Sequence, residues 1–178
     1  MTKKLKVYVI TLSRVFPVSH PKAGLKTYFK TKLENTHVVP FDPNGDSVPD
    51  GQPQLKRHTI RANYELWRKR FEQIERGEAC LSIRQWTGKP YASKQIEIAR
   101  LTKDDGIGLQ KLTIHKQINP VYVAMDTYIY VDGRLQNSMF EVRLSNNDGL
   151  TLRDWEMWFK DYDLSKPLAV IQFTKFRY

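Results

Sequence analysis

Apolar residues recur at two different spacings along the 178-residue chain. Before residue 79 they fall three or four residues apart, which is typical of helices with one buried face. This spacing predicts one helix over about 22–34 and a second over about 62–76, where Trp67, Phe71 and Ile74 share a face. Lysines occupy most of the remaining faces of the first helix, so we expect that side to lie in water.

From residue 79 onward the chain contains short β-branched and aromatic runs separated by turns. The strands predicted in this region are 79–86, 95–101, 109–115, 121–131, 138–144 and 168–173. One further strand is predicted near the start of the chain, over 5–12. Asp132-Gly133 is a strong hairpin signal, and Thr151 with Asp154 predicts the start of a third helix. The short links favour antiparallel pairing. The pattern therefore predicts an α+β domain, a small and mostly antiparallel β-barrel decorated by about three helices.

A proline-, glycine- and aspartate-rich stretch at 40–54 is predicted to be a loop. Too little sequence precedes it to form a separate core, so residues 1–178 are expected to be a single domain. Cys80 is the single cysteine, and we expect it to be an inert core thiol in a reducing compartment. The four histidines lack metal-ligand spacing, so neither a metal nor another cofactor is expected. No apolar stretch is long enough to cross a membrane, which favours a cytoplasmic protein without a membrane partner.

The formal net charge is +10, and most of the excess lies in the first 70 residues. Residues 1–70 hold 14 basic and 5 acidic side chains, a difference of +9. The excess could be a solvated surface or a positive face that binds phosphates. Charge alone does not choose among RNA, DNA and an anionic small molecule.

One basic cluster combines several reactive groups: Lys56, Arg57, His58, Thr59 and Arg61 lie just before the second predicted helix. A lysine beside a hydroxyl can act as its base when burial or nearby cations lower the lysine pKa. Arginines can bind a phosphate or carboxylate through two hydrogen bonds. The alternative interpretation is an edge strand that leads into a helix, with its charges in water.

The run Lys56-x-x-Thr59-x-Arg61 resembles the Lys-x-x-Thr-x-Arg motif near the start of ASCH domains, which belong to the PUA-like β-barrel superfamily. The resemblance covers roughly residues 55–178. It extends to the order of elements: a short helix and a strand follow the motif. Late in the chain, the turn at 147–151 leads into an amphipathic helix and a closing strand.

This resemblance implies a domain associated with nucleic acids, usually RNA. Some ASCH members hydrolyse the amide of acetylated cytidine, and others cleave RNA. It implies that Thr59 is the nucleophile, Lys56 its activator and Arg61 an anion contact. The third catalytic residue of the family is a glutamate shortly before the last helix, and the nearest candidate here is Asp148, which is one methylene shorter.

Aromatic residues around the turn at 87–90 suggest a second way to bind nucleic acid. A base could stack between Trp86 and Tyr91 while Arg84 and Lys89 contact phosphates. The alternative is that Trp86 belongs to the core and Tyr91 covers its rim.

Three functions therefore remain open. The favoured one is binding of RNA or a modified nucleoside, with DNA as an alternative, in a basic cleft that also includes Arg57 and His58. The second is hydrolysis of acetylated cytidine or of RNA at the same cleft. The third is a non-catalytic module that binds an unknown protein partner.

Overall fold

The computed structural model describes residues 4–36, 49–119 and 124–178, and within them the α+β class is confirmed. The strands are β1 (Lys6–Leu12), β2 (His58–Arg61), β3 (Ala79–Trp86), β4 (Gln95–Leu101), β5 (Gly108–Asn119), β6 (Ala124–Val131), β7 (Arg134–Leu135) and β8 (Leu168–Gln172). The helices are α1 (Phe29–Thr36), α2 (Tyr64–Glu75), α3 (Phe140–Asn147) and α4 (Leu152–Phe159), with a 3-10 turn at Lys103–Asp105.

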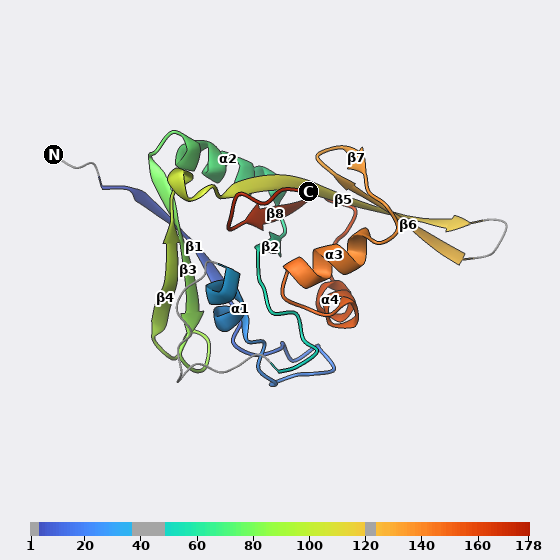
Figure 1. Cartoon of the computed structure of the whole chain (residues 1–178), viewed down its shortest axis with the longest axis horizontal. Helices are drawn as coiled ribbons and strands as arrows, with labels where there is room; N and C mark the ends of the chain where they lie inside the picture. Colours follow the sequence, from blue (N-terminus) through green and yellow to red (C-terminus); the bar gives the residue numbers. More distant parts are fainter. Residues whose placement is uncertain (1–3, 37–48, 120–123) are drawn as a thin grey trace.

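The strands form two separate sheets, one of three strands in the order β1-β3-β4 and one of five in the order β2-β8-β5-β6-β7. β1 and β3 are parallel, and every other pair is antiparallel. Figure 1 shows the three-stranded sheet along one side of the molecule and the five-stranded sheet crossing near its top. Helix α1 lies beside the first sheet, whereas α3 and α4 lie together below the second (Figure 1).

The predicted motif forms an edge strand that is fixed by the end of the chain. β2 pairs with β8 from His58↔Gln172 to Arg61↔Ala169. All five residues of β8 are buried, because this strand lies between β2 and β5 in the core of the sheet. The motif is therefore held at the border between a hydrophobic core and the helices beside it.

The first predicted helix is shorter than its apolar pattern suggests. α1 begins at Phe29 instead of residue 22, because residues 13–28 form a loop with its own hydrogen bonds. The Thr27 hydroxyl donates to the carbonyl of Ser13 at 2.7 Å, and Tyr28 has a left-handed φ of 57°. Leu25, expected to be in the buried stripe, is 60% exposed. Local side-chain bonds to the backbone here replace the first turns of a helix.

The segment predicted as a strand at 138–144 is instead part of α3, so the described residues contain four helices and not about three. Phe140 and Leu144 lie four residues apart and are both buried, which is the spacing of a helix face. The hairpin at Asp132-Gly133 is present, but its second strand, β7, has only two residues. The β-branched and aromatic run of β6 ends at Val131, and no such run follows the turn to form a longer second strand.

The remaining predicted elements are close to their expected positions. β3 and β4 have the predicted bounds, and α2 buries Trp67, Phe71 and Ile74. Thr151 caps α4 by accepting from the Asp154 amide. Cys80 is buried, as expected of a core thiol. Residues 40–48 of the predicted loop at 40–54 lie outside the described residues. The same is true of residues 121–123, the start of the strand predicted at 121–131. In the part of the chain that is described, no helix is both long enough and apolar enough to cross a bilayer.

Candidate functional site

Lys56 is positioned by main-chain hydrogen bonds to two helices that are far apart in sequence. Its amide donates to the carbonyl of Lys32 and to the hydroxyl of Thr36, both at 3.0 Å, near the end of α1. The next amide, of Arg57, donates to the carbonyl of Asn147 at 2.8 Å, at the end of α3. These bonds direct the Lys56 side chain into the interior, where the residue is only 1% exposed.

The buried amine of Lys56 meets the buried carboxylate of Asp148. Lys56 Nζ lies 2.7 Å from Asp148 Oδ1 and donates to the Asp148 carbonyl at 2.6 Å. It also lies 3.9 Å from the centre of the Phe29 ring, within cation–π range. Because the carbonyl belongs to the C-cap of α3, the lysine also stabilises the negative end of that helix. The pair therefore has a structural role in addition to any chemistry.

Burial moves the two partners toward their neutral forms. It lowers the pKa of Lys56 and raises the pKa of Asp148, and in each case the charge of the partner opposes the shift. A nearby Arg61 lowers the Lys56 pKa further. Deprotonation of Lys56 is therefore easier than that of a lysine in water, and the neutral amine that results can accept a proton.

Lys56, Thr59, Arg61 and Asp148 all line one cavity of about 60 Å³. Its other walls are Thr11, Leu12, Ser13, Phe29, Ile60, Leu150, Trp158 and Phe159. Among the described residues, the Thr59 side chain has no hydrogen-bond partner. A volume of this size has room for a few ordered waters or a small polar group.

Arg61 provides a second cation at this cavity. Its Nη2 donates to the carbonyl of Thr11 at 2.9 Å. Within the described part of the chain it forms no ion pair with a carboxylate. Its remaining donors are available to an anion or a developing negative charge in the cavity.

A much larger cavity, of about 680 Å³, shares Thr11 and Ser13 with the small one. It is lined by three of the residues predicted to bind nucleic acid, Trp86, Lys89 and Tyr91. Trp86 is only half-buried, so it is not the core residue of the alternative interpretation. The small cavity, with its buried lysine, and the wide cavity, with its aromatic pair, therefore have Thr11 and Ser13 as a common wall.

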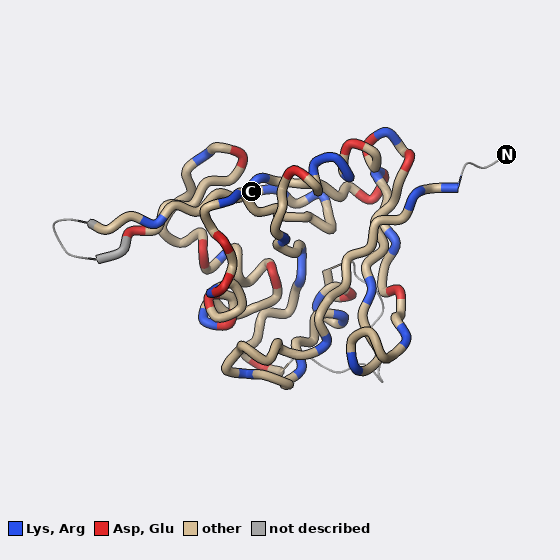
Figure 2. Tube along the Cα trace, turned by 180° about the vertical axis from the view of Figure 1, so that it is seen from behind, with Lys and Arg blue, Asp and Glu red and all other residues tan. Residues whose placement is uncertain are grey.

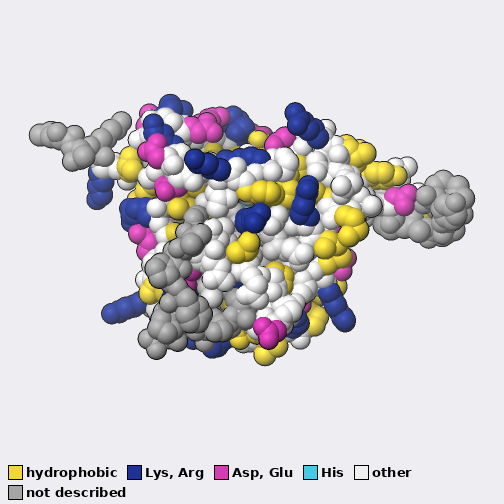
Figure 3. All heavy atoms as spheres, in the orientation of Figure 1, with side chains coloured by type: hydrophobic (Ala, Val, Ile, Leu, Met, Phe, Trp, Pro, Cys, Tyr) yellow, Lys and Arg dark blue, Asp and Glu magenta, His cyan; other side chains and the backbone are white. Residues whose placement is uncertain are grey.

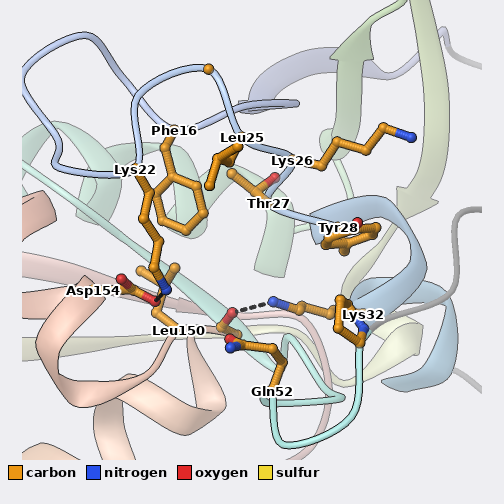
Figure 4. Close-up of a pocket in the computed structure, with 13 residues that line it drawn as sticks. Phe16, Lys22, Leu25, Lys26, Thr27, Tyr28, Lys32, Gln52, Leu150 and Asp154 are labelled. Atoms are coloured by element: carbon orange, nitrogen blue, oxygen red, sulfur yellow. Dashed lines mark hydrogen bonds and ion pairs between the residues drawn. The ribbon is translucent and has the colours of Figure 1, made fainter.

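A third cavity, of about 400 Å³, lies on the other side of Leu150. Figure 4 shows Lys22 and Lys32 entering it from opposite sides, the first bonded to Asp154 and the second to the carbonyl of Gly149, each at 2.8 Å. Burial lowers the pKa of Lys32 to about 8. The sequence pattern placed Lys32 on a solvated helix face, so its burial was not predicted.

Three other predicted binding residues line none of these three cavities. Arg57 stacks on Phe176, with 5.3 Å between the guanidinium carbon and the ring centre. His58 is completely buried, its Nε2 is 2.8 Å from the Tyr178 hydroxyl, and burial holds its pKa well below the usual range. Arg84 donates to Ser82 at 2.8 Å.

The basic residues do not gather around the motif on the surface. Figure 2 shows Lys and Arg positions along the whole trace, interspersed with Asp and Glu. On the face shown in Figure 3 the basic side chains are scattered among uncharged ones and do not merge into one patch. At the small cavity the cations of the motif, Lys56 and Arg61, are buried and half-buried.

Comparison with protein-family models, curated proteins and solved structures finds no match for this chain. Among the described residues, no group of three or more His, Cys, Asp or Glu side chains is arranged to hold a metal ion.

Proposed function

We propose that this chain is an ASCH-like domain that binds RNA or a modified nucleoside at the cavity lined by Lys56, Thr59 and Arg61. The observation that carries the proposal is the convergence of these three motif residues with Asp148, which is 92 positions from Lys56, on one small cavity. Asp148 was the candidate for the acidic residue of the family, and its carboxylate bonds the motif lysine directly.

The order and pairing of the strands also support a PUA-like arrangement. The motif strand β2 is followed by the short helix α2 and then by β3, in the order that the resemblance implies. The closing strand β8 returns to pair with β2, so that the beginning and end of the resembling region meet. We include a PUA-like barrel, with the two sheets as its halves, in the proposal.

The dimensions of the cavity restrict how a ligand binds. About 60 Å³ accommodates a small substituent of a base, such as an acetyl group, while the rest of the ligand lies in the adjoining space. Arg61 then faces a carbonyl oxygen or phosphate, and the walls of Phe29, Leu150 and Trp158 exclude water. This favours modified over unmodified nucleosides.

RNA binding is tested by filter binding over a salt series. For about six contacted phosphates on a single strand, log K should fall with log salt at a slope of roughly −4, because each contact releases counterions. Arg61→Gln should weaken binding at every salt concentration, whereas the exposed Lys69→Gln should not. Affinity that does not change with salt would contradict the electrostatic part of the proposal.

A second candidate function is hydrolysis of an amide carried by the bound base. It is favoured because Thr59, with a free hydroxyl, and Lys56, with a buried amine, line the same cavity. In this reaction Thr59 Oγ attacks the amide carbonyl carbon and its proton passes to Lys56 Nζ. The C–N bond then breaks, and the base nitrogen leaves with that proton. Water hydrolyses the threonine ester, which releases acetate and restores the hydroxyl. Arg61 is placed to stabilise the oxyanion.

Acetylated cytidine and bulk RNA, incubated separately with the protein, test this candidate. Wild type should deacetylate the nucleoside, and mass spectrometry should detect a transient acetyl group on Thr59. Thr59→Ala should abolish turnover, while Thr113→Ala in β5 serves as the matched control. Equal turnover by wild type and Thr59→Ala would rule out the assigned nucleophile, and cleavage of bulk RNA alone would assign ribonuclease activity instead.

A further inference from the structure

The wide cavity next to the motif contains an exposed aromatic pair. The rings of Trp86 and Tyr91 are 5.4 Å apart at an angle of 53°, so they border one space without stacking on each other. Tyr91 is 93% exposed, although a tyrosine side chain gains free energy when it is covered. A large aromatic residue left in water beside a half-buried tryptophan is a surface that a flat ring can cover.

The backbone keeps Tyr91 in this position at a conformational cost. Its φ is 62°, in the left-handed region that a bulky side chain rarely adopts. The turn around it is fixed by the Ser93 hydroxyl, which donates to the Lys89 carbonyl and accepts from the Gly88 amide, both at 2.9 Å. Residues held in such sparsely populated conformations cluster at binding sites, so this turn is a candidate for one.

Cationic side chains surround the aromatic pair, and they distinguish among ligands. Arg14 and Lys89 line the same cavity, and both are exposed. Arg14 bonds the carbonyl of Thr87, and the Lys89 ammonium has no partner among the described residues. Neither cation faces a carboxylate there, so each is available to a phosphate. A free nucleoside carries no phosphate and would leave both without an anionic partner.

The position of this cavity links it to the motif. It shares Thr11 and Ser13 with the chamber of Lys56 and Thr59, and its volume of about 680 Å³ is that of a site for a whole nucleotide or more. A ligand whose base substituent enters the small chamber would pass these two residues on its way out.

We propose that the cavity of Trp86 and Tyr91 is a base-stacking and phosphate-binding subsite, and that the physiological ligand is therefore a single-stranded nucleic acid instead of a free nucleoside. A base lies against the two rings, and the phosphates on either side meet Arg14 and Lys89. Paired bases are stacked within a duplex and cannot cover the rings, so single strands are selected. This inference rests on the proposed function, since it names the ligand class of the same site.

Fluorescence anisotropy with a labelled single-stranded RNA hexamer tests the inference, with a DNA hexamer of the same sequence and the RNA duplex as further probes. Tyr91→Ala should weaken RNA binding by about 5- to 150-fold, the loss of one stacked base. Tyr91→Phe, which keeps the ring, should bind within about twofold of wild type. Tyr128→Ala, at a tyrosine of β6 far from this turn in sequence, should have no effect, and the duplex should bind more weakly than the single strand.

Charge is tested in the same way, with Lys89→Gln compared to Lys69→Gln, which removes an exposed charge from α2. Lys89→Gln should lower both the affinity and the salt slope, and Lys69→Gln should change neither. Tighter binding of RNA than DNA would identify RNA as the ligand, and equal binding would assign the subsite to single strands of both kinds.

The inference and the proposed function can fail separately. If Thr59→Ile, which fills the small chamber, abolishes hexamer binding while Tyr91→Ala binds like wild type, the stacking subsite is wrong and the proposed function stands. If Tyr91→Ala weakens binding while Thr59→Ile does not, the subsite stands and the small chamber is not part of it. If wild type binds neither the RNA nor the DNA hexamer, the inference and the proposed function are both overturned.

Discussion

The small chamber around Lys56 and the wide cavity around Tyr91 meet at Thr11 and Ser13, yet they hold their polar groups in opposite ways. In the small chamber the lysine is buried and forms an ion pair with Asp148, and the main chain at residues 56–57 is hydrogen-bonded to α1 and α3. In the wide cavity the tyrosine is exposed, its backbone is left-handed, and Lys89 has no partner among the described residues.

This difference predicts whether a substitution in each region lowers stability or binding. Removing one member of a buried ion pair leaves an uncompensated charge in the core, so changes in the small chamber should lower stability. An exposed side chain in a strained conformation contributes little to folding, so changes in the wide cavity should lower binding without lowering stability. Activity and stability should therefore separate between two sites that share a wall.

The largest expected effect is on stability at the small chamber. Lys56→Met leaves the Asp148 carboxylate buried without its partner, and should lower the free energy of unfolding by about 3–5 kcal/mol. For a chain of this size the melting temperature should fall by roughly 6–20 °C. Thermal and denaturant unfolding measure both quantities.

The double variant Lys56→Met with Asp148→Leu is the control, since it removes both charges and keeps the volume filled. It should recover most of the lost stability, because well-packed apolar residues can replace a buried pair at little cost. If Lys56→Met alone is as stable as wild type, the carboxylate is not held in the core by this lysine and the contrast between the two regions disappears.

A smaller effect concerns pH and the neighbouring Lys32. Its pKa in the folded chain is about 8, below the ordinary value of 10.5. Between these values the unfolded chain binds more protons than the folded one, so stability should rise as pH increases from about 8 to 10.5. Over the whole window the gain should be on the order of 3 kcal/mol, at about 1.4 kcal/mol per pH unit.

Denaturant unfolding at pH 7.5, 9 and 10 measures this slope. Lys32→Met should reduce it to the part that the lowered pKa of Lys56 contributes, and Lys69→Gln, which alters an exposed lysine, should leave it unchanged. A slope of equal size in Lys32→Met would show that the general positive charge of the chain, and not this buried amine, causes the pH dependence.

The smallest expected effect lies in the wide cavity. Tyr91→Gly suits the left-handed φ of 62°, so the relief of strain and the greater flexibility of unfolded glycine should nearly cancel. Stability should change by less than about 1 kcal/mol, while affinity for the RNA hexamer should fall as in Tyr91→Ala. A large loss of stability would mean that Tyr91 supports the fold instead of serving a ligand.

The sequence predicted those elements whose local pattern and tertiary surroundings agree. α2, β3 and β4 follow from their periodicity, and the cap at Thr151 follows from a side chain that bonds its own helix. The pattern failed where local bonds or distant packing decide the structure. Thr27 bonds the carbonyl of Ser13 and helps to hold the start of the expected first helix as a loop. Phe140 packs against Tyr178 at the end of the chain, which no local window contains.

The site shows the same limit. The motif named Lys56, Thr59 and Arg61 from their spacing, and the resemblance added Asp148, whose contact with Lys56 spans 92 positions. Ser13 and Arg14 could not be found in this way, because the loop that brings them to the cavities follows no periodic pattern. Lys32 lies in α1 and is buried by distant segments that the helix pattern does not contain. Residue type identified the chemistry of the motif, and only the fold showed which neighbours share its space.

The central claim is that a group of the ligand enters the chamber beside Thr59. Thr59→Val and Thr59→Ile test it most directly, because neither has a hydroxyl and they differ by one methylene that points into the chamber. The measurement is the affinity of each variant for an RNA hexamer carrying one acetylated cytidine, with melting temperatures compared to confirm that both fold. The account predicts at least about tenfold weaker binding by Thr59→Ile, since one methylene in a well-defined pocket is worth about 1–3 kcal/mol. Equal affinity of the two folded variants would contradict it.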